Sequence, residues 1–179
     1  IGNLFVGSTA VAPSDVIAAL HGTADSTATF IVGETRMPQA VTALLAGGAL
    51  AVAGLLMQTL FANPLADPSI LGLNAGASLG VAVATLWLGG SVAAVGTTFS
   101  GSSLTLLTAF VGAGSIMALL VLCATWVHNR MLLLILGLMV SYAVSSLVSL
   151  LSFTADAAGL HAYVIWGLGS FGTATWQRL

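Results

Sequence analysis

"FANPLADPSILGLNAG", residues 61–76, interrupts a very apolar chain with two prolines, an asparagine and an aspartate, and then places glycines four residues apart. Asn63 and Asp67 each precede a proline, and the residue before a proline is pushed out of the helical region of backbone space. A helix that approaches this stretch must therefore end, and the chain must turn. The turn separates one long apolar segment from several others.

The composition around this turn is typical of a membrane protein. Of the 179 residues, 58% are hydrophobic and 4% are charged, and the mean hydropathy is +1.10. Ordinary soluble domains carry about 25% charged residues. The three basic residues are Arg36, Arg130 and Arg178, too few to neutralise nucleic-acid phosphates, so nucleic-acid binding is excluded. The lone Cys123 closes no internal disulfide and is interpreted as a small buried hydrophobe.

Four apolar segments are long enough to match a bilayer core about 30 Å thick. They cover about residues 38–62, 69–88, 104–127 and 131–153. Pro38 suits the first turn of the first segment. The sequence therefore predicts an all-α fold, a polytopic transmembrane helical bundle with about four spanning helices.

The connections are expected to alternate between the two sides of the bilayer. One face receives residues 1–37, 89–103 and 154–179, and the other receives the turns 62–68 and 128–130. Within the first of these, "DSTATFIVGET", residues 25–35, is interpreted as a loop with a brief β-branched run. The last segment carries aromatic residues of the kind found at membrane interfaces, and it is expected to lead into a further helix.

Small residues recur along single helical ridges of the predicted spans. The candidates are Gly47 and Gly54, then Gly72, Gly76 and Gly80, and finally Ser141, Ser145 and Ser149. A helical glycine costs about 1 kcal/mol relative to alanine, so a glycine ridge indicates close backbone contact with a partner helix or with cargo. The serines could line a pathway or join helices, and packing is the favoured interpretation because small polar residues commonly join helices in bilayers.

The titratable residues predict no bond chemistry. The carboxylates all lie outside the predicted spans, at Asp15, Asp25, Glu34, Asp67 and Asp156. They form no close pair, and no nucleophile with an adjacent base or phosphate-binding glycine loop is present. His128 has no histidine or carboxylate three or four positions away, so an interfacial cap is favoured over a proton relay or metal ligand. The chain is therefore interpreted as a non-enzyme with no cofactor and no metal site.

Two of the polar features have simple structural explanations. Taken alone, the turn at residues 62–68 is more often a plain helix–helix connector, since loops of this length are ordinary. Arg36, taken alone, is an end-of-helix anchor whose charge reaches the interface.

A resemblance to a known family favours functional roles for both the turn at residues 62–68 and Arg36. Residues 34–84 resemble the signature region of the FecCD family through Arg36-Met37-Pro38-Gln39, Gln58, the run from Asn63 to Pro68, and Leu71-Gly72. The similarity continues more loosely through residues 132–151 and 164–179. FecCD proteins are the permeases of binding-protein-dependent ABC importers for iron–siderophore complexes, haem and vitamin B12.

The resemblance implies a specific architecture. This chain would be the amino-terminal half of a roughly ten-helix permease that lies in the inner membrane as a homodimer. Its partners would be the second permease copy, cytoplasmic ATPase subunits, a periplasmic substrate-binding protein and membrane lipid. The whole segment 1–179 would then be a partial transmembrane permease domain.

The resemblance also implies roles for individual residues. Arg36 matches a position that docks acidic residues of the binding protein, and Gln39 stands where the family has a second basic residue. The turn of Asn63, Pro64 and Leu65 matches a cytoplasmic gate. A second gate maps near the next cytoplasmic turn, at His128, Asn129 and Arg130.

The mechanism implied is alternating access, in which partner ATPases drive the helices between outward-open and inward-open states. The leading alternative is an ion-coupled secondary transporter, which usually needs an ionisable residue within a span. No Asp, Glu, Lys, Arg or His occurs in residues 40–62 or 104–127. A structural membrane protein is the third interpretation, and it would show no dependence on an ATPase.

Overall fold

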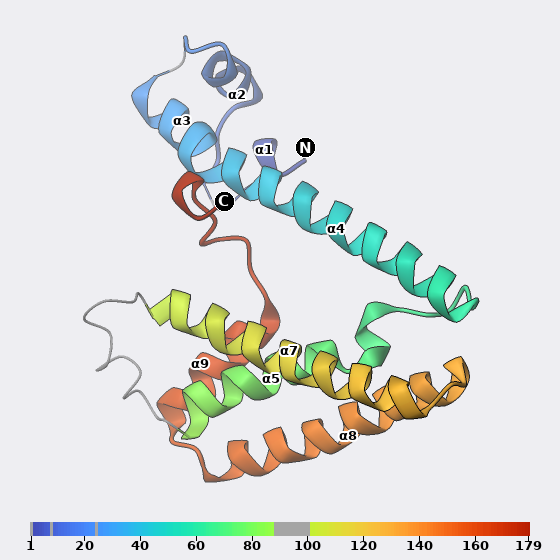
Figure 1. Cartoon of the computed structure of the whole chain (residues 1–179). Coiled ribbons are helices and arrows are strands. Elements are labelled where there is room, and N and C mark those ends of the chain that lie inside the picture. The colour runs from blue at the N-terminus through green and yellow to red at the C-terminus, as the bar shows by residue number, and fades with distance from the viewer. Residues whose placement is uncertain (1, 8, 24, 88–100) are drawn as a thin grey trace. The chain divides into compact units, whose positions relative to one another are not determined.

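The computed structural model describes residues 2–7, 9–23, 25–87 and 101–179, and all regular elements among them are helices (Figure 1). The all-α prediction is therefore confirmed. The chain forms two units: residues Ile1–Val52 with Ser170–Leu179, and residues Ala53–Gly169.

The first unit contains the N-terminal elements and the C-terminal end of the chain. Its elements are α1 (Gly2–Phe5), α2 (Pro13–Leu20), α3 (Ser26–Phe30), the π-helix η1 (Ile31–Arg36), the first part of α4 (Met37–Phe61) and the 3-10 helix η4 (Trp176–Arg178). Proline occupies the first position of α2, where its missing N–H costs nothing. Val16 of α2 and Val32 of η1 are the buried valines of this unit.

The segment 25–35 differs from its prediction as a loop. Residues Thr27–Phe61 form one continuous helical run of 35 residues. The β-branched residues in this segment have weak helix propensity, but burial of Val32 to 1% exposure shows that packing overrides it. Pro38 lies in the first turn of α4, as predicted, but the helical run also continues before it through η1. It lies just after η1, and the wider π-helical turn is the place where a helix accommodates a residue that lacks an N–H.

The second unit is built on two long helices. Its elements are the end of α4, the 3-10 helix η2 (Pro68–Leu71), α5 (Leu73–Ala82), the π-helix η3 (Val83–Trp87), α7 (Gly101–Trp126), α8 (Arg130–Thr154) and α9 (Ala157–Leu168). Helix α5 packs against both α7 and α8, and α9 packs against η3. The main core cluster contains Phe61, Ala66, Leu71, Ile116, Leu120 and Val144. A second cluster contains Ala82, Leu86 and Val148.

Three helices are long and apolar enough to cross a membrane, namely Thr27–Phe61, Ser103–Trp126 and Arg130–Thr154. The predicted span 69–88 is represented by a shorter apolar helix, Leu73–Trp87. It starts late because Pro68–Leu71 form a 3-10 turn and Gly72 has a left-handed backbone with φ of 81°. Most of the predicted connection 89–103 lies outside the described residues, and its last three residues belong to α7.

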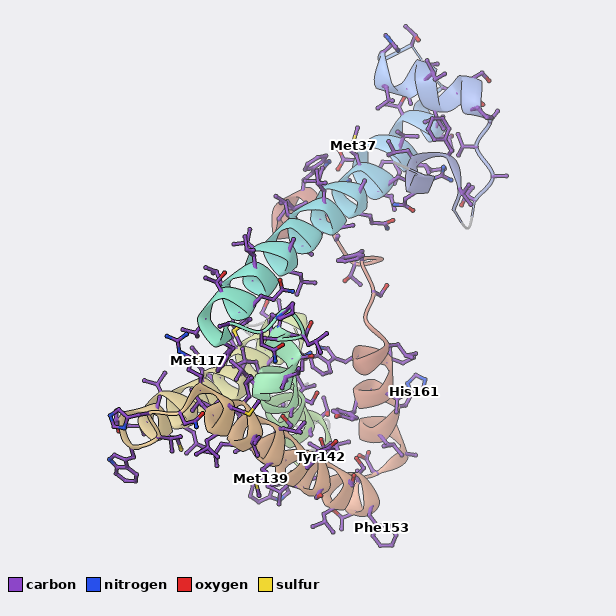
Figure 2. All side chains as sticks on the ribbon, turned by 90° about the vertical axis from the view of Figure 1, so that its right-hand side faces the viewer. Met37, Met117, Met139, Tyr142, Phe153 and His161 are labelled. Atoms are coloured by element: carbon purple, nitrogen blue, oxygen red, sulfur yellow. The ribbon has the colours of Figure 1, made fainter. Side chains whose placement is uncertain are left out.

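The surface of the long helices is apolar. Figure 2 shows Met139, Tyr142 and Phe153 projecting outward from α8, and Phe153 is 91% exposed. In the most apolar stretch of Thr27–Phe61 no residue is buried inside the protein. Such faces are stable when the surrounding solvent is lipid, because lipid tails are as apolar as leucine.

Candidate functional site

The turn after α4 is held by backbone and side-chain hydrogen bonds. The N–H of Ala62 donates to the Thr59 carbonyl at 3.3 Å, and the N–H of Asn63 donates to the Gln58 carbonyl at 3.1 Å. This bond pattern is a Schellman motif, in which the first residue past the helix is left-handed. Ala62 occupies that position with φ of 48°, where glycine is usual.

Both residues that precede the prolines accept hydrogen bonds from the chain two positions later. The Asn63 Oδ1 accepts from the Leu65 N–H at 2.9 Å. The Asp67 Oδ1 accepts from the Ser69 N–H at 2.7 Å and from the Ser69 hydroxyl. These bonds to the side chain and backbone of Ser69 hold the pKa of the exposed Asp67 carboxyl below its usual value. The sequence singled out the prolines, and the structure adds an Asx turn to each.

The side chains of the turn divide into an anchored set and a projecting residue. Phe61 and Ala66 are buried in the core cluster with Leu71. Leu65 lies between them in sequence and is 81% exposed. The turn therefore presents one leucine on a rigid, anchored frame.

The second predicted gate, at residues 128–130, is exposed where α7 gives way to α8: residues 127–129 form the turn and Arg130 begins α8. Asn129 caps α8, and its Oδ1 accepts from the N–H groups of Met131 and Leu132 at 2.9 and 3.4 Å. His128 and Arg130 are exposed beside it. Among the described residues, no group of three or more His, Cys, Asp or Glu is placed to hold a metal ion.

Both turns belong to the same end of the second unit. A Cβ atom added to Gly72 would lie 3.5 Å from Ile116 Cγ2 and 3.2 Å from the Gly137 carbonyl oxygen. Ile116 lies in the later half of α7 and Gly137 in the first half of α8, the halves nearest to the connection between these helices. Tertiary packing thus brings the 62–72 turn toward the 127–129 turn.

The glycine ridge of α5 lies directly against other helices. A Cβ atom on Gly76 would lie 2.6 Å from the Gly112 carbonyl oxygen, and one on Gly80 would lie 2.0 Å from the Thr108 carbonyl oxygen. Gly112 is the matching small residue on α7, and sequence reasoning did not single it out. Its signal is the run "VGAGS" at residues 111–115 in the middle of a long apolar segment.

The other small residues of the predicted ridges either lie in open positions or form hydrogen bonds within their own helix. Among the described residues, no atom lies within 4 Å of a Cβ atom added to Gly47 or Gly54. The Ser141 hydroxyl donates to the Gly137 carbonyl at 2.8 Å, and the Ser149 hydroxyl donates to the Ser145 carbonyl at 2.9 Å. Ser145 and Ser149 are exposed, whereas Ser141 is half-buried beside Gly72.

The predicted docking residues lie in the first unit and face its own N-terminal segment. The Arg36 side chain is 4% exposed, and its guanidinium donates to the carbonyls of Leu4 and Thr9. The Gln39 Oε1 accepts from Asn3 Nδ2 at 3.3 Å. A cavity of about 530 Å³ lies beside this amide pair and is lined by Asn3, Gln39, Ala40, Ala43, Leu44, Phe171 and Gly172. The docking role of both residues stays a prediction, and the structure shows that neither side chain is fully presented to solvent.

Comparisons with known proteins point to one transport family. The model of the family described as "FecCD transport family" matches residues 1–179. The chain is 46% identical over 91 residues to the ferric enterobactin transport system permease protein FepD of Escherichia coli (strain K12), an alignment that covers 51% of this chain and 27% of the relative. It is 32% identical over 145 residues to the hemin transport system permease protein HmuU of Yersinia pestis, with 80% of this chain and 42% of the relative covered.

A solved structure of a metal-chelate type ABC transporter in an inward-facing conformation matches with a TM-score of 0.78 and 26% sequence identity. That match covers 98% of this chain and 51% of the solved chain. The chain thus spans about half or less of the length of these relatives.

Proposed function

Because this chain belongs to the FecCD transport family, we propose that it acts in the permease subunit of an ABC importer that carries a metal chelate, haem or a corrinoid inward across the inner membrane. The observation that carries the proposal is the family match over residues 1–179. The three long apolar helices and the likeness to a metal-chelate type transporter support it. The chain itself supplies a conduit, and ATP hydrolysis belongs to separate partner subunits.

The inner gate of this conduit is the turn of Asn63, Pro64 and Leu65. Arg36 precedes helix α4 and Asn63 follows it, and the helix has 25 residues. At about 1.5 Å per residue such a helix is long enough to cross a hydrocarbon core of about 30 Å. The turn and the N-terminal segment would therefore lie on opposite sides of the bilayer, with the turn on the cytoplasmic side.

The rigidity of the turn suits a gate. Two Asx turns and two prolines restrict the backbone, and the buried Phe61 and Ala66 anchor both ends of the gate segment. If α4 tilts, Leu65 would therefore move together with the helix, because the restricted loop does not absorb the motion. His128, Asn129 and Arg130 lie toward the same end of the second unit and form the other side of the proposed gate.

The small residues divide into two proposed roles. We assign Gly72, Gly76 and Gly80 to helix packing, because a side chain at any of these positions would meet α7 or α8. Ser141 belongs to the same contact. Gly47, Gly54, Ser145 and Ser149 lie in open positions, and they are assigned to contacts with the second permease copy, with lipid or with the pathway.

The test is transport by the full-length protein reconstituted in liposomes with its partner ATPase and binding protein. A ferric siderophore, haem and cobalamin are supplied separately as labelled cargo. We expect one class to be taken up in an ATP-dependent way, and uptake should stop when the ATPase carries a substitution that abolishes hydrolysis. Uptake driven by a proton or sodium gradient without the ATPase would identify a secondary transporter instead.

The gate assignment is tested separately at Leu65. Replacing Leu65 by alanine should change the rate of cargo release to the cytoplasmic side while leaving thermal stability close to wild type, because the side chain is 81% exposed. Leu60, which is 57% exposed on α4 and faces outward, provides a matched Leu→Ala control. Equal transport by wild type and Leu65→Ala, with the control also unchanged, would remove Leu65 from the gate.

A further inference from the structure

Arg36 and Gln39 both form hydrogen bonds with the N-terminal segment of the same chain, of which the structure describes residues 2–7 and 9. The Arg36 Nη1 donates to the Leu4 carbonyl at 2.7 Å, and its Nη2 donates to the Thr9 carbonyl. Gln39 accepts from Asn3. The predicted docking residues therefore make three hydrogen bonds to one short segment, and a fork-shaped cation joins two carbonyls that are five residues apart in sequence.

Burial of the guanidinium explains why the segment folds around it. A charged group that is 4% exposed is costly unless its donors are satisfied. The planar guanidinium presents several N–H groups in fixed directions, so one side chain can bridge two acceptors. Gly7 lies against it, because a Cβ atom there would be 3.1 Å from Nη2 and 3.3 Å from the carbon of the guanidinium. The absence of a side chain at position 7 lets the backbone close over the charge.

The π-helix η1 brings a second segment to the same place. At the C-terminal end of η1 the Met37 N–H donates to the Val32 carbonyl, five residues back. The equivalent donor to the Gly33 carbonyl would be the N–H of residue 38, which is a proline and has none. The Trp176 Nε1 donates to this Gly33 carbonyl at 2.8 Å. Hydrogen bonds thus join residues 4 and 9 and the C-terminal segment to the same π-helix, and Figure 1 shows α1 and the C-terminal end of the chain beside the start of α4.

We propose that Arg36 is a positioning residue, an internal clasp that fixes residues 2–7 and 9 on η1, and that its part in docking is indirect. The guanidinium holds the shape of the face and does not offer its charge to a partner. This docking part rests on the proposed function, whereas the clasp itself does not. A direct ion pair needs a partner carboxylate within about 4 Å of the guanidinium, and Leu4, Gly7 and Thr9 lie against it.

The clasp is tested by hydrogen exchange of residues 2–9 in the full-length protein in lipid nanodiscs. We expect Arg36→Gln to raise the exchange rate of this segment at least tenfold and Arg36→Lys to raise it less. Glu34→Gln, which removes an exposed charge from the same turn, is the control and should leave exchange unchanged. Exchange within twofold of wild type in Arg36→Gln would overturn the clasp.

A second variant keeps the test decisive if Arg36→Gln does not fold. Gly7→Val retains the arginine but adds atoms where the guanidinium lies. It should also raise exchange of residues 2–9, and unchanged exchange in this variant would contradict the proposal. Gly2→Val is its control, because no atom of the residues that the structure describes lies within 4 Å of a Cβ atom added at Gly2.

The docking part is tested with the substrate-binding protein that delivers cargo to the full-length permease. Arg36→Gln should weaken its affinity for the permease–ATPase complex while leaving the dependence of affinity on salt concentration as in wild type. A thiol crosslink between Asn3→Cys and Gln39→Cys, in a Cys123→Ala background, should restore the affinity. A reduced salt dependence without rescue by the crosslink would show a direct ion pair and overturn the indirect role. If wild type binds no binding protein, the proposed docking fails, and the exchange experiment still decides the clasp.

Discussion

Gly76 and Gly112 meet backbone to backbone across the α5–α7 contact: a Cβ atom added to Gly112 would lie 2.1 Å from the Gly76 carbonyl oxygen. No real Cβ approaches an oxygen so closely, so one of the helices would have to move. The contact joins a short apolar helix to one of the three long ones. It therefore fixes the position of α5, and of the turn that precedes it.

Substitution of Gly112 by alanine should destabilise the second unit. Forcing extra atoms into a packed contact typically costs about 1–3 kcal/mol. Gly47→Ala is the matched control, since a Cβ atom at Gly47 meets no described atom within 4 Å. The control should be neutral or stabilise its helix by up to about 1 kcal/mol. The measurement is the free energy of unfolding of the full-length protein in mixed micelles, and equal values for both variants would contradict the assigned packing.

Ala62→Gly should stabilise the turn after α4. Ala62 has φ of 48°, and the left-handed conformation costs about 1–2 kcal/mol for a residue with a Cβ atom. Glycine removes this strain but has more freedom in the unfolded chain, so the expected gain is below about 1 kcal/mol. The control is Ala53→Gly in the interior of α4, which should destabilise by about 1 kcal/mol. A loss of stability in both variants would argue against a left-handed Ala62.

Stability should depend on pH through Asp67. The folded pKa of this carboxyl is lowered by its hydrogen bonds to Ser69. Its stabilising contribution is therefore fully present above the unfolded pKa of about 3.9, and it is lost as the pH falls through the lower folded value. Thermal melting between pH 6 and pH 2 should show a steeper acid decline in wild type than in Asp67→Asn. Parallel curves for the two proteins would contradict this assignment.

Asn129→Ala should shorten or destabilise the start of α8. The side chain accepts from two N–H groups of the first turn, and loss of such a cap costs about 0.5–2 kcal/mol. Asn129→Asp should retain most of the stability because a carboxylate also caps. Arg130→Ala is the neighbouring control, since Arg130 is exposed. The unfolding free energy measures the cap, and transport by the same variants shows separately whether the turn acts as a gate.

Much of the fold follows from local pattern. The membrane class, the end of α4 at Phe61 and the turn before α5 are readable from hydropathy and from Asn63 and Asp67 before their prolines. The family membership is also confirmed, because the signature of residues 34–84 is long and specific. The individual gate and docking roles stay predictions.

Other features depended on contacts between residues far apart in the chain. The loop predicted over residues 25–35 is helical, and the start of α5 is later than hydropathy indicated. Glycine spacing alone did not distinguish the ridge at Gly76, which meets α7, from Gly47, which lies open. The spacing of residues in the sequence predicts which face of its helix a residue lies on. Whether another helix packs against that face depends on the tertiary structure.

The sequence by itself determined which solvent this chain requires and where its backbone must turn, because transfer free energy and the constraint of a proline on its predecessor act locally. The tertiary structure decided that Arg36 is enclosed by the carbonyls of Leu4 and Thr9. A charge at the end of an apolar segment has the same local pattern whether it faces water or its own chain. The positions of Leu4 and Thr9, which no local rule fixes, make the difference.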